Sequence, residues 1–235
     1  MLLAAVEAFL RDWPYLTLLI LLGVAGVCSG PSILGATAGV RRLSATEADT
    51  LAGYGVPVDD VRVLTARGAS PTAFAVGVLP GYRHVCVTER LVETLTPAEL
   101  AAVVAHERGH LQRYHVLPRI GLPVVFVVGW AAAVSAGLSG AFLGGLALVV
   151  PVTLVSFGLS RWTERDADAY VVRHGGGPAL ADALDRLGRD GHLHRDEPGL
   201  RRLLSRHPTL AERVTRLRAT TRSAQPRRPR ENSGD

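Results

Sequence analysis

Apolar residues are concentrated in two long stretches of the chain, and the segments between and after them are polar and mixed. The first stretch, Tyr15–Val40, has no charged residue and exceeds the roughly 20 residues that a helix needs to cross a bilayer. The second, Val116–Ser160, has Arg119 as its single charge, and Gly137–Gly140 divides it into two apolar halves. We predict a retained N-terminal span and a transmembrane helical hairpin, with a flat or re-entrant pair as the alternative for the hairpin.

A cleaved signal peptide is the alternative for the first stretch. The residues before it carry Glu7 and Asp12 against Arg11, so this leading region is net negative. A secretory signal starts with a positively charged region. The pattern therefore favours a retained membrane segment.

The polar segment before the hairpin has signals for two strands and a helix. Ala73–Val78 and His84–Thr88 are strand-like and are separated by Leu-Pro-Gly-Tyr-Arg, a turn sequence, so they predict a β-hairpin. Thr96 and Glu99 form a capping box with a proline at the first helical position. The helix that they start is predicted to run to about His115.

The segment after the hairpin predicts three helices. The first covers about Arg161 to His174 and stops at three consecutive glycines, the second covers about Pro178 to Arg189, and the third starts at a capping box formed by Thr209. The fold class is mainly α with a small β-sheet (α+β). We divide the chain into five parts: an N-terminal membrane segment (1–40), a first catalytic half (41–115), the hairpin (116–160), a second catalytic half (161–221) and a disordered tail (222–235).

Composition narrows the possible functions. The chain is 48% hydrophobic with a mean hydropathy of +0.21, as expected for a membrane protein. Its net charge of +5 comes from arginines that are scattered through loops and the tail, without a basic stripe that alternates with aromatic residues. This distribution argues against nucleic-acid binding. The two cysteines form no CxxC motif, which argues against a thiolate metal site.

A metal-binding motif lies on the predicted capped helix. His106 and His110 are four residues apart, so they project from one helix face and can hold one tetrahedral Zn²⁺. Glu107 lies beside them and can act as a general base toward a water whose pKa zinc lowers to about 7. A solvated helix face is the alternative, but the helix is otherwise apolar. The pattern indicates a zinc peptidase with one zinc ion per chain.

A catalytic zinc site normally has three protein ligands and one open position. Glu164 is the best candidate for the third ligand, with Asp168 one turn later on the same helix face. Asp168 would then accept a hydrogen bond from the outer nitrogen of a ligand histidine. The alternatives are Asp168 as the ligand, or an ordinary charged helix face.

The topology of the hairpin is consistent with this site. His110 and Glu164 can meet only if the chain between them crosses the membrane an even number of times, and two spans satisfy this condition. Arginines flank the hairpin on both soluble sides, whereas its glycine-rich tip has none. The positive-inside rule then predicts a multi-pass cell-membrane protein whose catalytic domain faces the cytoplasm.

These motifs together resemble the HtpX-like and CAAX-prenyl-protease family of membrane zinc peptidases. The resemblance covers about residues 72–217. It includes the Ala73–Gly77 strand, His106-Glu-Arg-Gly-His110, the apolar hairpin, Glu164-Arg-Asp-Ala-Asp168 and the late Arg206-His-Pro208 segment. It implies a gluzincin-like zinc peptidase domain that is interrupted by the membrane hairpin.

The resemblance also implies roles for further residues. Ala73, Phe74 and Ala75 would form an open edge strand that pairs with an extended substrate, and His207 would stabilise the oxyanion. Packing or capping is an equal alternative for His207. We expect the remaining histidines to be solvated or structural: His84, His115, His174, His192 and His194.

The predicted function is a membrane-bound zinc metalloendopeptidase that hydrolyses protein or peptide substrates. Membrane protein quality control is the role that the resemblance implies. One alternative is a sensor-type membrane zinc peptidase in a signalling pathway. Another is a non-catalytic membrane scaffold with a structural zinc, although such a site would need a fourth protein ligand.

Overall fold

The computed structural model describes both polar segments and the apolar hairpin between them. The described residues are 7, 11–15, 17–18, 21–23, 39–65, 69–79, 81–190 and 208–224. The predicted N-terminal span lies for the most part outside these residues, and so does His207. Both therefore stay predictions.

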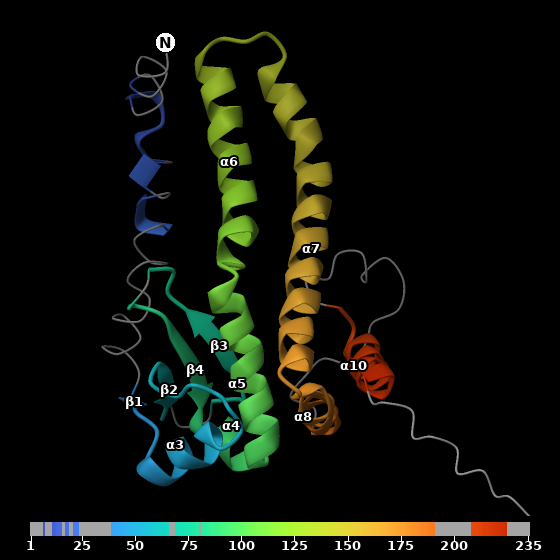
Figure 1. The fold of residues 1–235 in the computed structure, drawn as a ribbon. Helices are drawn as coiled ribbons and strands as arrows, with labels where there is room; N and C mark the ends of the chain where they lie inside the picture. The colour runs from blue at the N-terminus through green and yellow to red at the C-terminus, as the bar shows by residue number, and fades with distance from the viewer. Residues whose placement is uncertain are drawn as a thin grey trace, which may run out of the picture.

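A four-stranded mixed sheet forms one end of the molecule (Figure 1). Its order is β1-β2-β4-β3, with β2 and β4 parallel and the other two pairs antiparallel. The predicted hairpin corresponds to β3 and β4, and β3 lies at an edge of the sheet. The sequence analysis did not find the other two strands. The bounds are β1 (Val40–Arg41), β2 (Val61–Leu64), β3 (Ala73–Val76) and β4 (His84–Thr88).

The hairpin turn depends on a glycine. Gly77 has a φ of +91°, and a Cβ at this position would lie 2.0 Å from the carbonyl oxygen of Tyr82. A side chain would therefore clash with the returning strand, which explains the glycine. The turn sets the register in which Ala73 pairs with Val87 and Val76 pairs with His84.

The core of the soluble part is built from the sheet and two helices, α5 (Pro97–Gln112) and α8 (Gly177–Arg189). Four valines of the two central strands are fully buried, α5 contacts β4 and the edge strand β3, and α8 packs against α5. Two short helices, α3 (Ala45–Ala52) and α4 (Glu89–Thr94), complete this part of the molecule. The core residues include Val61, Val63, Val85, Val87, Leu100, Val104, Leu180 and Leu184.

Helix α5 (Pro97–Gln112) carries the metal-binding motif and begins at the predicted cap. The backbone N–H of Thr96 donates to Glu99 Oε2 at 2.8 Å, and the backbone N–H of Glu99 donates to Thr96 Oγ1 at 3.4 Å. Glu99 also accepts a hydrogen bond of 3.0 Å from Arg186 on α8 (Gly177–Arg189). The capping box therefore fixes the start of α5 and joins it to a second helix.

Two long helices, α6 (Val116–Ser135) and α7 (Ala141–Arg173), run side by side away from the sheet (Figure 1). Both are long and apolar enough to cross a membrane, by length and composition. The prediction of a separate helix from Arg161 is wrong, because α7 continues from the second apolar half through Glu164. From Leu159 to Arg173 the sequence has no glycine or proline that would end a helix. One helix therefore joins the predicted span to the predicted third ligand.

The last described helix, α10 (Leu210–Ala224), packs against α8 and α7. Thr209 caps it by accepting a hydrogen bond of 3.2 Å from the backbone N–H of Glu212. The helix extends slightly past Arg222, where the disordered tail was predicted to begin, and residues 225–235 lie outside the described part. The mainly helical class with a small mixed sheet is confirmed.

Candidate metal centre

The candidate site lies where α5 approaches α7 closely. A Cβ at Gly109 would lie 3.3 Å from the side chain of Tyr170 and 3.4 Å from the Cα of Ala167. The absence of a side chain at Gly109 lets the two backbones approach each other. As a result, the α5 face that carries His106 and His110 meets α7 directly.

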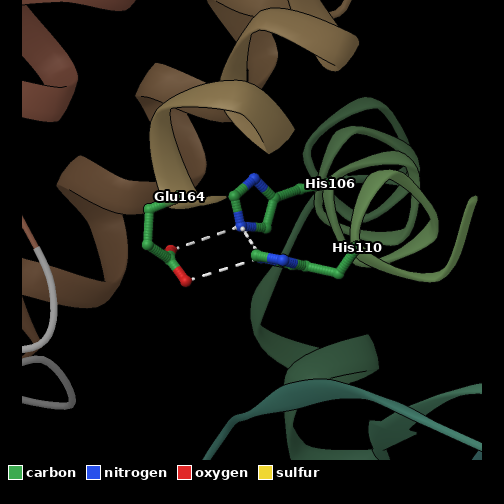
Figure 2. A group of neighbouring side chains, drawn as sticks. All are labelled: His106, His110 and Glu164. Carbon is green, nitrogen blue, oxygen red and sulfur yellow. Dashed lines mark hydrogen bonds and ion pairs between the residues drawn. The ribbon is translucent and has the colours of Figure 1, made fainter. Parts of the chain in front are cut away.

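The three predicted ligands converge at this contact. Glu164 on α7 points between the two histidines of α5 (Figure 2). Its carboxylate oxygens lie 3.6 Å from Nε2 of His106 and 3.4 Å from Nε2 of His110. One ligand atom from each residue falls within 4.8 Å of the others. His106 and Glu164 are 5% and 4% exposed, so the group is buried.

Asp168, the alternative third ligand, occupies a different position. Its Oδ1 lies 3.1 Å from Nδ1 of His106, the ring nitrogen that points away from Glu164. A proton on Nδ1 can face this carboxylate, which leaves the lone pair of Nε2 directed into the group. The geometry thus favours Glu164 as the ligand and Asp168 as the residue that orients His106.

The donor set fits a bound cation. The Nε2 atoms of His106 and His110 lie 3.3 Å apart, and both face the Glu164 carboxylate. Burial lowers the pKa of His106, but contacts with Asp168 and Glu164 outweigh burial and raise it to about 9. Burial and the nearby His106 charge lower the pKa of His110 to about 3. Two nitrogens and a carboxylate match the ligands that Zn²⁺ prefers.

Glu107 lies on the other side of the histidines, toward the sheet edge. Burial raises the pKa of Glu107 to about 7, against the opposing effect of His106. The backbone of Ala75 in β3 faces the Glu107 carboxylate and lowers its pKa slightly. The predicted general base therefore lies between the metal ligands and the predicted substrate strand.

Two arginines of α10 hold Asp168, and the sequence analysis gave neither of them a role. Arg213 Nη2 donates to Asp168 Oδ1 at 2.7 Å, and Arg216 Nη2 donates to Asp168 Oδ2 at 2.9 Å. Arg213 Nη1 also lies 3.5 Å from Glu164 Oε2. Their i, i+3 spacing was a usable signal, because it places both on one helix face.

A cavity of about 1280 Å³ connects the site to the two apolar helices. The three residues of the predicted substrate strand line it, together with Glu107 and the three candidate ligands. It continues between α6 and α7, where aromatic and aliphatic side chains form its wall. These wall residues include Ile120, Phe126, Trp130, Val149 and Phe157.

His115 is the histidine that the sequence analysis underestimated. It is 2% exposed, so the solvated alternative is wrong. Its Nδ1 lies 2.9 Å from Nδ1 of His110, and its Nε2 lies 3.0 Å from Oδ2 of Asp166. Sequence spacing gave no signal for this contact, because a turn between α5 and α6 produces it.

The fold and the site define a class: an HExxH-containing protein in which a later helix adds a glutamate to the histidine pair. The sequence model of peptidase family M48 matches residues 37–221, so the chain belongs to peptidase family M48. The chain is 32% identical over 198 residues to a protein named "Protease HtpX homolog" from Desulfatibacillum aliphaticivorans. It is 29% identical over 201 residues to another of that name from Dictyoglomus turgidum.

The coverage of these matches is partial. They span 69% and 70% of this chain but 63% and 64% of the two relatives. The crystal structure of S. mikatae Ste24p matches with a TM-score of 0.70 at 20% identity, over 89% of this chain and 60% of that one. The structural likeness shows the fold, and the chain spans less than two thirds of these proteins.

Proposed function

We propose that the chain is a membrane-bound zinc metalloendopeptidase with one zinc ion held by His106, His110 and Glu164. The observation that carries this proposal is the convergence of these three side chains, two of them buried and His110 largely so, beside Glu107 in a cavity bounded by a sheet edge. The family and the names of its relatives support a protease. A site with three protein ligands keeps the open position that catalysis needs and that a structural zinc site lacks.

The division of roles follows from the positions of the side chains. Zinc bound by this set would supply a Lewis acid and would lower the pKa of a nearby water. Glu107 would accept the proton of the attacking water at its carboxylate and deliver it to the leaving amine. Asp168 would hold the Nδ1 proton of His106. His207, outside the described residues, remains a candidate for oxyanion stabilisation.

The edge strand supports a peptide as the substrate. Ala73, Phe74 and Ala75 of β3 line the cavity, and β3 pairs with β4 on one side only among the described strands. An extended peptide could add to the open side through backbone hydrogen bonds. Backbone hydrogen bonds depend little on the side chains of the substrate. Such binding therefore suits an endopeptidase that acts on many proteins.

The arrangement of the helices supports a multi-pass membrane protein. The ends of α6 and α7 nearest the ligands lie on one side, while their connection lies at the far end (Figure 1). Trp13 Nε1 donates a hydrogen bond to Ser135 Oγ at this far end, whereas β1 lies at the opposite end. The predicted N-terminal span, most of which lies outside the described residues, remains part of the proposal. The arginine distribution supports a catalytic domain that faces the cytoplasm.

We propose membrane protein quality control as the biological role of the chain.

The test is zinc content and casein cleavage by detergent-purified protein, with the intact chain compared with Glu107→Gln. Glutamine has nearly the shape of glutamate but cannot take the proton. We expect one zinc in both chains and cleavage by the intact chain alone. Zinc in both with cleavage by both would remove the role of Glu107. An intact chain without zinc would overturn the proposed function.

A further inference from the structure

His115 contacts His110 on the side of the ring that faces away from Glu164. Glu164 contacts Nε2 of His110, and His115 contacts its Nδ1. The second ring nitrogen of His115 is in contact with Asp166. A buried histidine needs partners for both ring nitrogens, and these two contacts supply them.

The chain of contacts determines where the protons lie. Asp166 forms an ion pair with Arg113, which favours its ionised form, and an ionised carboxylate can only accept. An uncharged His115 that donates from Nε2 to Asp166 presents a lone pair on Nδ1. His110 can then place its own proton on Nδ1, facing this lone pair. The lone pair of His110 Nε2 is left facing Glu164, in the tautomer that metal binding requires.

The turn that places His115 has an uncommon backbone conformation. Tyr114 has a φ of +52°, in the left-handed region that residues other than glycine seldom adopt. Its ring lies under the guanidinium of Arg83, 4.2 Å from the ring centroid, and its hydroxyl is hydrogen-bonded to the same arginine. Arg83, which lies in the β3–β4 turn, therefore supports the conformation of Tyr114 that directs His115 back toward His110. The backbone N–H of His115 donates to the His110 carbonyl at 3.1 Å.

We propose that His115 and Asp166 form a positioning pair that holds the second histidine ligand in the tautomer and orientation required for metal binding. The pair acts through His110. The inference rests on the metal site proposed above. Loss of such outer partners typically weakens metal affinity about 10- to 100-fold.

A merely structural role for His115 makes a different prediction from a positioning role. Asparagine can place an amide oxygen near the position of Nδ1, where it accepts from His110, but it does not reach Asp166. Glutamine can reach the position of Nε2 beside Asp166 but leaves His110 without its acceptor. Packing alone would favour glutamine, which is closer to histidine in size, or would affect both variants alike, whereas positioning favours His115→Asn over His115→Gln.

The experiment measures the zinc dissociation constant of the full chain in detergent by chelator competition, and the absorption spectrum of its Co²⁺ form. We compare the intact chain with His115→Asn, His115→Gln, Asp166→Asn and the control His174→Gln. His174 is an exposed histidine whose Nδ1 contacts the Tyr170 carbonyl at the end of α7. We expect His115→Gln to bind zinc about 10- to 100-fold more weakly with a changed Co²⁺ spectrum, and Asp166→Asn about 10-fold more weakly.

The remaining outcomes separate this inference from the proposed function. The zinc dissociation constant of His115→Asn should stay within about threefold of that of the intact chain, a change well below that expected from loss of an outer partner. The dissociation constant of His174→Gln should equal that of the intact chain. If both His115→Gln and Asp166→Asn bind zinc as tightly as the intact chain, the positioning pair is overturned and the proposed zinc site is not affected. Equal losses in the two His115 variants would also overturn it and indicate packing. An intact chain that binds no metal would overturn the proposed function itself.

Discussion

The two candidate histidine ligands lie on the same helix but are supported by different surroundings. His106 has a carboxylate, Asp168, directly behind its ring, and two arginines of α10 hold that carboxylate. His110 has a second histidine behind its ring, and the carboxylate of Asp166 follows one step later. Each candidate ligand is thus connected to an aspartate of α7. His106 contacts Asp168 directly, whereas His110 is connected to Asp166 through His115.

The difference lies in burial and in the origin of the support. Asp168 is 2% exposed, and its arginines come from a helix more than 40 residues later in the chain. The Asp166 side chain is 20% exposed and pairs with Arg113 near the end of α5. The environment of His106 therefore depends on the docking of α10, whereas that of His110 depends on the local turn between α5 and α6.

The largest expected effect comes from the residue that serves both histidines. Glu164→Gln would leave two imidazoles with a weak neutral third ligand. We expect zinc affinity to fall by more than the roughly 100-fold upper limit for loss of an outer partner. Zinc content after dialysis against a weak chelator measures this, with Asp166→Asn treated in parallel. Retention of zinc by Glu164→Gln would show that another residue is the third ligand and would make Asp168 the next candidate.

The second expected effect compares the two aspartates. Asp168→Asn removes a buried charge and leaves Arg213 without its main partner, so we expect the free energy of unfolding to fall by about 3 kcal/mol and zinc affinity to fall toward 100-fold. Asp166→Asn removes a more exposed charge, and about a 10-fold loss of affinity with little loss of stability should result. Chelator competition and urea unfolding measure both quantities.

The order of the two aspartate variants is the informative result. Equal effects on zinc affinity would mean that direct and relayed support are equivalent. A larger effect of Asp166→Asn would mean that the relay through His115 dominates. Either result would contradict the comparison drawn from burial.

Local signals in the sequence predicted α5 and the candidate ligands, but not that the helix of Glu164 continues from the predicted span. The capping box of Thr96 and the spacing of His106 and His110 predicted α5 and its candidate metal-binding face, and Glu164 was proposed because Asp168 follows it one turn later on the same helix face. These signals extend over a few residues of one element. The β-hairpin was likewise predicted from its strand pattern and its glycine-containing turn.

The parts that the sequence analysis missed depend on contacts between distant elements. Strand β1 has two residues and acquires its conformation by pairing with β2, so its own sequence has no strand pattern. Arg213 reaches Asp168 across 45 residues of chain, and His115 reaches Asp166 across 51. Spacing within one helix cannot predict such contacts, because tertiary packing determines them.

A smaller effect is expected from Arg83, which contacts Tyr114 next to His115 and donates hydrogen bonds to the carbonyls of Val78 and Leu111. Arg83→Met keeps an unbranched apolar side chain but removes these hydrogen bonds, the one to Tyr114, and the cation–π contact, which is worth about 0.5–1 kcal/mol at a partly exposed site. If this energy holds the turn that carries His115, zinc affinity should fall about 2- to 5-fold. The matched control is Arg90→Met, at an exposed arginine on α4. An equal effect in the control would exclude a specific role for Arg83.

The smallest expected effect tests whether the start of α5 influences either ligand. Burial raises the pKa of Glu99, but hydrogen bonds from Thr96 and Arg186 outweigh burial and lower it from its ordinary value near 4.5. A lowered pKa in the folded state means that the ionised Glu99 stabilises the fold above pH 4.5, and that this stabilisation is lost as the pH falls below it. Glu99→Gln keeps an acceptor for the Thr96 N–H but removes the charge.

We therefore expect Glu99→Gln to lower the melting temperature by a few degrees at pH 7, with the difference from the intact chain narrowing as the pH falls below 4.5. Zinc affinity at pH 7 should stay unchanged, because the capping box lies more than one helical turn before His106 and contacts none of the residues that support the ligands. Melting curves at pH 7 and pH 4, together with chelator competition, measure these quantities. A loss of zinc affinity in Glu99→Gln would show that the position of α5 as a whole, and not the two aspartates of α7, determines how firmly the histidines are held.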